Sequence, residues 1–410
     1  MSATLGRRDH LTFKANLKAT RYGWLRLTPA YSVHLVGDLL DRAATDDTLV
    51  LDPYCGTGTT ALVCAERGIA CRTTDINPFL VWLTRAKTAR YDAGALEAFG
   101  AAAARVADAI RAGDAGPEWL PALHRIERWW DEPTLHALGR AMAAIRAEGG
   151  APAVADLLRI AFCRVLIERA SVSFGHQSMS FATRVADEAR LPDAELVGLA
   201  AAAWTAAARG LERSAATPIR ARPVATLADA RDLRAALTGD RAGCVITSPP
   251  YPNRMSYIRE LRPYMYWLGY LADGRAAGEL DWQAIGGTWG CATSNVARWT
   301  PPPGRSVAYP GFADILAGIA ARSDLLSRYV HKYFHDMTDH VASLAGVLER
   351  GATVHYIVGN SKFYDVLVPV ERIYAALFDA HGLTGVRVET IRKRSSKREL
   401  FEYVVSARLP

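Results

Sequence analysis

The sequence contains few cysteines, and they are not arranged as metal ligands or as a disulfide framework. Six cysteines are scattered along the chain without a Cys-x-x-Cys pair, at Cys55, Cys64, Cys71, Cys163, Cys244 and Cys291. Zinc sites and redox pairs use closely spaced cysteines, and disulfide frameworks belong mainly to short secreted chains. We therefore expect no metal site and predict a reducing, cytoplasmic environment.

Long apolar runs are also missing. No stretch of the chain reaches the ~20 apolar residues that span a bilayer. The first residues, MSATLGRRDH, lack the apolar core of a secretory signal. We expect no membrane partner. Hydrophobic residues make up 50% and charged residues 22% of the sequence, which is typical of a globular enzyme.

Positive charge exceeds negative charge, with a net charge of +7 and an isoelectric point near 9.1. This excess suits a polyanionic partner, but many cytoplasmic enzymes are basic as well. The basic residues gather in two groups near the ends: Arg7, Arg8, Lys14, Lys18, Arg21 and Arg26, and then Arg392, Lys393, Arg394, Lys397 and Arg398. For any single one of them we expect a solvated face or a hairpin tip.

Residues 48–92 have the pattern strand, glycine turn, helix, strand, turn, helix. A short apolar strand over residues 48–51 leads into the glycine turn, and we expect a helix over 60–67 and a strand over 71–74. Pro78 stands in the first turn of the next helix, a position that tolerates its missing N–H. This order predicts an α/β fold that opens as a doubly wound, Rossmann-like sheet.

Residues 93–218 have a different character. They are rich in Ala, Leu, Arg and Glu, and apolar residues recur at helical spacing, as over residues 153–166. We predict a mainly helical insertion, which is a candidate target-recognition region. For the Trp129-Trp130 pair and the segment 171–181, we expect core packing over contact with a substrate.

Strand signals return after the insertion. We expect strands over residues 224–227, 244–247 and 354–358, followed by an antiparallel pair over 386–391 and 401–405 that a basic hairpin joins.

One segment of this last part lacks periodicity. Residues 280–309 are rich in Gly, Pro, Trp and polar residues, so we predict a long loop, which in a compact domain is usually functional. The chain thus divides into an N-terminal segment with the cofactor-binding half of the sheet (1–92), the helical insertion (93–218), and the catalytic half (219–410).

The turn after the first strand has the composition of a ligand-binding loop. It reads Asp52-Pro53-Tyr54-Cys55-Gly56-Thr57-Gly58-Thr59-Thr60. Its glycines let the backbone approach a ligand, and the helix that follows offers free N–H groups. Asp75 ends the second strand, where a carboxylate can accept hydrogen bonds from both hydroxyls of a ribose. Asp52 would attract an ammonium or a sulfonium and repel a diphosphate, so a cationic ligand is predicted.

A second group of residues, Thr247-Ser248-Pro249-Pro250-Tyr251, follows an apolar strand. A Pro-Pro turn can simply close a strand, but this one also suits chemistry on an aromatic amino group. Such a nitrogen is a poor nucleophile because its lone pair is delocalised into the ring. Two acceptors, the Ser248 hydroxyl and the Pro249 carbonyl, can draw it toward tetrahedral geometry. Tyr251 can stack on the base.

Together these residues resemble the motifs of the amino-group DNA methyltransferases. Residues 52–60 are similar to the cofactor motif of the family, and residues 248–251 to its catalytic motif, in the serine form commonest among cytosine-N4 enzymes. The resemblance covers roughly residues 20–92 and 223–410. It implies S-adenosylmethionine as the cofactor, and double-stranded DNA with a flipped target base as the substrate. A cognate restriction endonuclease is a candidate partner.

The resemblance also implies the roles of individual residues. Catalysis falls to Ser248, Pro249, Pro250 and Tyr251. Cofactor binding falls to Tyr31, Asp52, Pro53, Tyr54, Gly56, Thr57, Gly58, Thr59, Thr60, Asp75, Ile76, Asp229 and Ala230. Among these, Asp229 matches the acidic position that bonds the cofactor's adenine amino group, and Tyr31 lies where the family contacts the methionine carboxylate. The family class with this motif order places target recognition between the motifs, which makes the insertion a candidate. The insertion departs from that class in being mainly helical and without evident recognition signals, so residues 280–309, after the catalytic motif, are a second candidate.

Three other functions stay open. Adenine-N6 methylation of DNA is one, because the first residue of the catalytic motif is an imperfect guide to the base. RNA guanine-N2 methyltransferases are similar in both motifs, but they usually have Asp in place of Ser248 and an N-terminal RNA-binding domain, for which we expect too few residues here. A catalytically silent DNA-binding subunit is the third, although the intact motifs argue against it. Carbon-5 cytosine methylation is disfavoured because the sequence has no Pro-Cys pair.

Overall fold

The computed structural model describes residues 11, 16, 20–25, 27, 30–45, 47–113, 116–173, 180–181, 191–394 and 399–410. Its centre is a seven-stranded sheet in the order β10-β11-β7-β6-β1-β2-β5. These strands are β1 (Val50–Asp52), β2 (Cys71–Asp75), β5 (Val224–Leu227), β6 (Ala242–Thr247), β7 (Leu348–Gly359), β10 (Thr384–Lys393) and β11 (Phe401–Arg408).

The sheet is parallel except for one strand. β5, β2, β1, β6 and β7 pair in parallel, whereas β11 is antiparallel to both β7 and β10. The predicted doubly wound, Rossmann-like sheet with a C-terminal antiparallel hairpin is therefore confirmed. The remaining strands form two small pairs, β3 (Val172–Ser173) with β4 (Ser180–Phe181) and β8 (Ser361–Phe363) with β9 (Val366–Val368).

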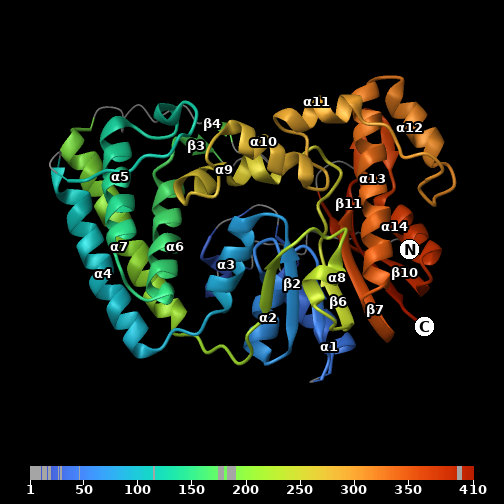
Figure 1. The fold of residues 1–410 in the computed structure, drawn as a ribbon, viewed down its shortest axis with the longest axis horizontal. Helices are drawn as coiled ribbons and strands as arrows, with labels where there is room; N and C mark the ends of the chain where they lie inside the picture. The colour runs from blue at the N-terminus through green and yellow to red at the C-terminus, as the bar shows by residue number, and fades with distance from the viewer. Residues whose placement is uncertain are drawn as a thin grey trace.

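Helices cover the sheet on both sides (Figure 1). They are α1 (Val33–Ala43), α2 (Thr59–Arg67), α3 (Pro78–Thr88), α8 (Leu233–Leu237), α13 (Asp324–Ala345) and α14 (Val370–Ala380). Polar residues determine where several of them begin. The Ser32 hydroxyl accepts a hydrogen bond from the main-chain N–H of His34 (3.2 Å) at the start of α1. The Asn77 carbonyl oxygen accepts one from Phe79 (3.0 Å) at the start of α3, where Pro78 takes the first position.

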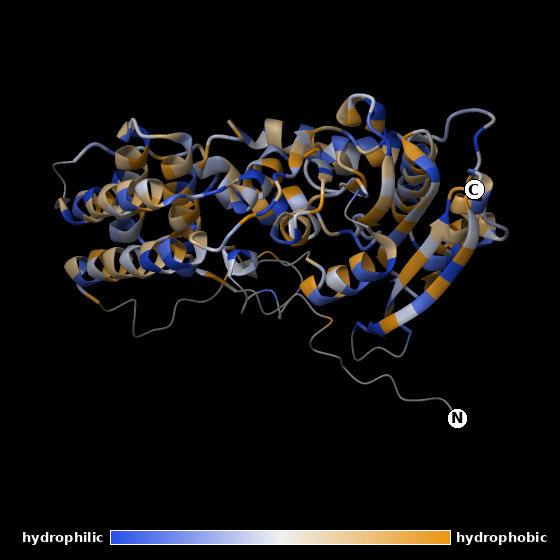
Figure 2. Ribbon diagram, turned by 90° about the horizontal axis from the view of Figure 1, so that it is seen from below, coloured by the Kyte–Doolittle hydropathy of each residue, from blue (hydrophilic) through white to orange (hydrophobic). Residues whose placement is uncertain are grey.

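The insertion is a helical bundle at the left of Figure 1. Its helices are α4 (Ala93–Arg111), α5 (Glu132–Ala147), α6 (Pro152–Glu168) and α7 (Asp193–Ala215), with a short 3-10 turn at Ile126–Arg128. Another 3-10 turn, Arg21–Gly23, precedes the first strand of the sheet. Trp129 and Trp130 are buried in the core of this bundle, as expected. Hydrophobic and hydrophilic residues fall on different faces of its helices (Figure 2), which is the pattern of helices that bury one side.

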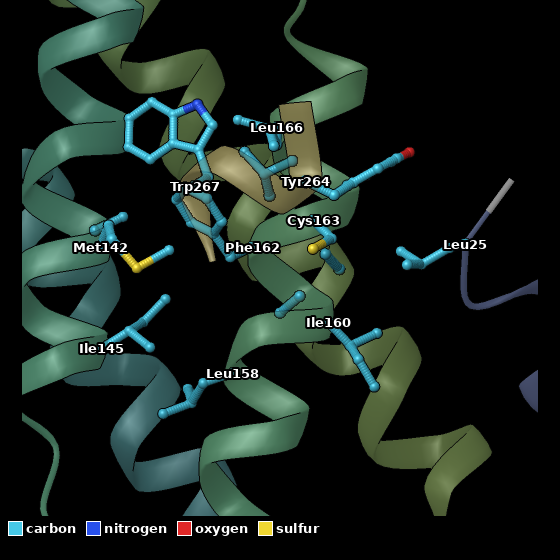
Figure 3. Packing of buried hydrophobic residues seen from close by; sticks show 14 of the residues in the cluster. Leu25, Met142, Ile145, Leu158, Ile160, Phe162, Cys163, Leu166, Tyr264 and Trp267 are labelled. Carbon is cyan, nitrogen blue, oxygen red and sulfur yellow. The ribbon is translucent and has the colours of Figure 1, made fainter. Parts of the chain in front are cut away.

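The bundle shares its core with a helix from the C-terminal half of the chain. This helix is α9 (Tyr257–Trp267), and its last residue, Trp267, is 1% exposed. The ring of Trp267 lies 5.2 Å from that of Phe162, centroid to centroid (Figure 3). It also lies 5.7 Å from the ring of Trp130. The ring of Tyr264 stacks on that of Phe79 in α3 at 5.3 Å. Contacts that cross the predicted boundaries thus join α9 both to the insertion and to α3 in the N-terminal half, and the division into segments stays a prediction.

The predicted long loop over residues 280–309 is wrong. The structure has helices α10 (Gly274–Gln283) and α11 (Cys291–Arg298) there, followed by α12 (Phe312–Ala320). The buried Asp281 carboxylate accepts hydrogen bonds from the Ser256 hydroxyl (2.5 Å) and from the main-chain N–H of Trp289 (2.7 Å). The bond to Trp289 connects α10 to the start of α11. Both helices are too short to show a clear helical period in the sequence.

One of the basic residues near the start of the chain is buried, not solvated. The Arg21 guanidinium is 1% exposed and donates to the main-chain carbonyls of Lys87 (2.9 Å), Ala215 (2.5 Å) and Thr217 (2.9 Å). It therefore ties the 3-10 turn Arg21–Gly23 to α3 and to the end of α7. The other members of that group, Arg7, Arg8, Lys14, Lys18 and Arg26, lie outside the described residues, as do Lys397 and Arg398. None of the described helices is long and apolar enough to cross a membrane.

Candidate functional site

A cavity of about 350 Å³ lies at the carboxyl ends of the parallel strands. Its walls come from the segments that follow β1, β2, β5 and β6, together with the start of α9 and the C-terminal hairpin. The strand order reverses between β1 and β6, and ligands of doubly wound sheets bind in the crevice at such a reversal.

Most residues that the sequence predicted for the site come together here. The cavity is lined by Tyr31, Pro53, Tyr54, Gly56, Thr57, Asp75, Ile76, Asp229, Ala230, Ser248, Pro249, Pro250 and Tyr251. Four predicted residues, Asp52, Gly58, Thr59 and Thr60, are not among its lining residues. They lie beneath it, where Asp52, Thr59 and Thr60 are buried.

The glycine loop, residues 52–60, requires glycine at position 58 and is held in place by the Lys87 side chain of α3. Gly58 has φ 77°, and a Cβ there would lie 2.8 Å from the Thr84 hydroxyl oxygen, so a larger residue would displace either the loop or α3. The Lys87 ammonium donates to the main-chain carbonyls of Thr57 (2.9 Å) and Tyr22 (3.4 Å). Burial lowers the pKa of Lys87 to about 7. This lysine connects the glycine loop to the 3-10 turn Arg21–Gly23.

Asp52 is enclosed by hydroxyl groups. It is 0% exposed, and its carboxylate accepts hydrogen bonds from the hydroxyls of Thr247 (2.6 Å) and Tyr31 (3.0 Å). The Tyr31 hydroxyl also contacts that of Thr60. Burial raises the pKa of Asp52 to about 7, even though these hydrogen bonds oppose the rise. Asp52 can therefore act on a bound cation through Tyr31 and through its field, whereas direct contact would require the cage to open.

Asp75 is in the cavity wall with its carboxylate held in place. One oxygen accepts from the main-chain N–H of Gly56 (3.1 Å) and the other from that of Asn77 (2.9 Å). Burial raises the pKa of Asp75 to about 6, and the two N–H donors act against it. The oxygen that Asn77 holds has a free lone pair, and the other also accepts from the Cys55 thiol (3.7 Å), a weak donor that a ligand hydroxyl can displace. The side chain can therefore accept from two hydroxyls of a ligand.

The Asp229 carboxylate already binds the side chain of Arg231, which the sequence did not predict. Its oxygens accept from Nε (3.0 and 3.1 Å) and Nη2 (2.6 Å) of Arg231. Burial alone would raise the pKa of Asp229, but the hydrogen bonds from Arg231 hold it below its usual range. Arg231 also donates to Asp336 of α13 (3.0 Å) and to the carbonyl of Gln283 (2.8 Å). An amino group that binds Asp229 must therefore share the carboxylate with Arg231.

The turn at residues 248–251 presents hydrogen-bond acceptors to the cavity. The Ser248 hydroxyl donates its proton to the carbonyl of Ile357 (3.0 Å) in β7. Since a hydroxyl has one proton and two lone pairs, the Ser248 oxygen is left to accept. The carbonyl of Pro250 accepts from the Tyr333 hydroxyl (2.7 Å), which also contacts the Tyr374 hydroxyl at 3.0 Å. The turn is therefore anchored both to the sheet and to α13.

Tyr251 is covered by the C-terminal hairpin. Its hydroxyl donates to Glu402 (3.1 Å), and the Arg394 guanidinium carbon lies 4.9 Å from the centre of its ring. Burial, and then the charge of Glu402, raise the pKa of Tyr251 well above its usual value. Arg392 pairs with Glu402 at 2.6 Å. Arg392 and Arg394 thus line the cavity, so the expectation of a solvated hairpin tip is wrong for both.

Sequence reasoning missed the contribution of α13. Its Tyr329 hydroxyl accepts from the main-chain N–H of Arg254 (3.2 Å), Tyr333 holds the turn, and the Met337 sulfur accepts from the Tyr54 hydroxyl (3.6 Å). These three residues are spaced four apart and therefore share a helix face. That spacing predicts an apolar face against the core, but nothing local indicates that the face supports both motifs.

Comparisons with known proteins add little to this geometry. No protein-family model and no curated protein sequence matches the chain. Two solved structures of the rRNA methyltransferase aviRa from Streptomyces viridochromogenes resemble it at 14% and 13% identity, with TM-scores of 0.32 and 0.33. Both alignments cover 97% of this chain and 92% of the other. Likeness at this level supports no conclusion about function, which depends on the site itself.

Within the described part of the chain, no group of three or more His, Cys, Asp or Glu side chains is placed to hold a metal ion.

Proposed function

We propose that this protein is an S-adenosylmethionine-dependent methyltransferase that modifies the exocyclic amino group of a flipped DNA base, with cytosine N4 as the target. The observation that carries the proposal is the shared cavity. A glycine loop with two carboxylates at strand ends lines one part of it, and the Ser248–Tyr251 turn lines another. A cofactor and a planar base can therefore meet at one point.

The residues of the cavity suit this cofactor. Asp75 offers acceptors to ribose hydroxyls, and Asp229 offers a carboxylate to an adenine amino group. The glycine loop brings main-chain N–H groups and little side-chain bulk. Beneath it, Asp52 places negative charge where a sulfonium would be stabilised. S-adenosylmethionine, when bound, supplies a methyl group on a positively charged sulfur.

The turn supplies the polarisation that the amino group needs. The Ser248 oxygen, whose proton is engaged by Ile357, accepts one hydrogen of the amino group, and the Pro249 carbonyl is the second acceptor. Transfer of the methyl group to the nitrogen would leave the sulfur as a neutral thioether, and the nitrogen would release one proton to solvent water. The protein acts by positioning and by preorganised dipoles, without a covalent intermediate.

Nucleoside mass spectrometry tests the proposal. The chain is expressed in a host free of DNA methylation, and the nucleosides of the host DNA are analysed. We expect N4-methylcytosine, and we expect it to disappear with Ser248→Ala, because loss of one preorganised hydrogen-bonding group typically lowers turnover on the order of 10²–10³-fold. Cofactor affinity, measured by calorimetry, is expected to stay nearly unchanged in this variant, whereas Asp75→Ala weakens it.

A matched control is Ser327→Ala. The Ser327 hydroxyl is also largely buried and also donates to a main-chain carbonyl, that of Leu316 at 2.9 Å, but it lies between α12 and α13. Full activity in this variant and none in Ser248→Ala assigns the effect to the turn. N6-methyladenine as the product would move the target to adenine. N2-methylguanine in RNA without any DNA product would replace DNA by RNA, and a chain that does not bind the cofactor would be a silent subunit.

A further inference from the structure

Arg254 has an unusual backbone conformation at the mouth of the cavity. Its φ is 63°, a left-handed value that non-glycine residues rarely adopt, and it lies three residues after Tyr251. The residues on either side of it, Asn253 and Met255, line the cavity, whereas the side chain of Arg254 is exposed. Such outliers persist only where the surrounding structure enforces them, and they cluster at functional sites.

The structure around Arg254 does enforce this conformation. Its N–H donates to the Tyr329 hydroxyl of α13 (3.2 Å), and the N–H of Met255 donates to the Asn253 side chain (3.1 Å). Ser256, two residues later, caps α9 and is fixed by the buried Asp281. The loop is therefore held from two sides, while the Arg254 residue that it carries stays exposed.

The charges around this loop favour an anion. Residues 251–262 contain three arginines, Arg254, Arg259 and Arg262, and one acid, Glu260, a formal excess of 3 − 1 = +2. Arg254 and Arg259 are both exposed, and neither forms an ion pair with an acidic side chain in the described ranges. On the other side of the cavity, Arg392 is already paired with Glu402. Arg394 has no acidic partner among the described residues, but the Asn360 carbonyl (2.9 Å) and the Tyr251 ring hold its guanidinium. Exposed positive charge without such contacts is therefore on the α9 side.

We propose that Arg254, supported by Arg259, binds the phosphate backbone of the strand whose base enters the cavity. This inference rests on the proposed function in taking a nucleic acid as the partner and in placing its base at Ser248. A nucleotide whose base stands at Ser248 must have its phosphates at the cavity mouth, because the sugar connects the two. Arg254 is exposed and, unlike its two neighbours, does not line the cavity, so it can meet the phosphate and leave the base to the turn.

Salt-dependent DNA binding tests this role. Affinity for a short fluorescently labelled duplex is measured by anisotropy over a range of salt concentrations. Each phosphate contact contributes about 0.9 to the slope of log affinity against log salt, so Arg254→Ala is expected to reduce the slope by about 1. Arg254→Lys keeps the charge and is expected to keep the slope.

Two further variants separate charge from backbone strain and from general charge loss. Arg254→Gly adopts the left-handed conformation freely, keeps the loop, and is expected to lose the slope as Arg254→Ala does. Arg350→Ala removes an exposed arginine near the start of β7, the end of that strand away from the cavity, and is expected to leave the slope unchanged. If Arg254→Ala and Arg254→Gly behave like Arg350→Ala, or if Arg254→Lys loses as much as they do, the inference is overturned.

Methyl transfer is measured separately on the same proteins. A wild-type chain that binds the duplex with the expected slope but transfers no methyl group contradicts the proposed function and supports the role of Arg254. A chain that methylates DNA but shows the same slope with and without Arg254 contradicts the inference alone.

Discussion

Gly359→Ala offers a direct test of how the C-terminal hairpin positions the turn. Gly359 ends β7 directly beneath Tyr251 and Arg394. A Cβ at this position would lie 2.9 Å from Cε2 of the Tyr251 ring and closer still to the Arg394 guanidinium. Since ordinary contact begins at 3.4 Å, the ring has to move by 3.4 − 2.9 = 0.5 Å or more. The arginine can swing away, but the Tyr251 hydroxyl is held by Glu402.

The expected effect falls mainly on turnover. A shift of about 1 Å in a positioning group can lower the rate on the order of 10²-fold, so half of that shift predicts a loss of about tenfold or somewhat more. Overpacking is expected to cost about 1–3 kcal/mol of stability. Transfer of labelled methyl groups to DNA gives kcat, calorimetry gives the affinity for the cofactor, which is expected to stay the same, and denaturant unfolding gives the stability.

Two further variants make the Gly359 test decisive. In Gly359→Ala with Arg394→Ala, the guanidinium clash is gone, so part of the stability is expected to return. Gly198→Ala is the matched control, because a Cβ there meets nothing within 4 Å. Turnover of Gly359→Ala within twofold of the wild type would refute the argument that the hairpin holds Tyr251 in its working position.

Three other measurements follow from buried groups. The pKa of Lys87 is lowered to about 7 in the folded protein. Between about pH 7 and the ordinary lysine pKa of about 10.4, the unfolded chain therefore binds more protons than the folded one. Wild-type stability is therefore expected to rise with pH in this window by up to about 1.4 kcal/mol per unit relative to Lys87→Met, and parallel curves would contradict the burial of the ammonium. The pKa of Asp52 is raised to about 7, so its carboxyl ionises as the pH increases through that value. In the wild type, the affinity for S-adenosylmethionine relative to S-adenosylhomocysteine, whose sulfur is uncharged, is expected to increase with pH, whereas in Asp52→Asn this ratio is expected to stay constant. The same pH profile in both proteins would show that Asp52 does not stabilise the cation. Trp267→Ala is expected to cost about 3–5 kcal/mol in urea unfolding, because its ring is enclosed by the bundle core. A loss below about 1 kcal/mol would mean that α9 does not share that core.

Much of the site could be predicted because its parts are local in the sequence. The glycine loop lies between one strand and the next helix, and Asp75 ends the following strand. In a parallel sheet these ends meet at one edge, so the motifs at residues 52–60 and 248–251 could be placed together before the structure was known. The antiparallel hairpin was predicted for the same reason, since alternation and a basic turn are short-range signals.

The predictions that failed concern residues whose surroundings come from distant segments. Residues 280–309 lack periodicity because α10 and α11 are short and depend on the buried Asp281, whose partners lie on both sides of it in the chain. Arg394 looked like part of a solvated tip because its partner, Tyr251, belongs to the turn after β6, far away in the sequence. No local pattern reports such pairs.

The sequence by itself determined the secondary structure around the two motifs, the Rossmann-like order of the sheet, and the side chains available at its strand ends. These follow from strand and helix periods and from glycine and proline geometry, which act over a few residues. Only the tertiary structure decided that Asp336 of α13 holds Arg231, that hydroxyls enclose Asp52, and that α13 and the C-terminal hairpin hold the Ser248–Tyr251 turn. Those contacts join segments far apart in the chain, and packing around a shared core selects them.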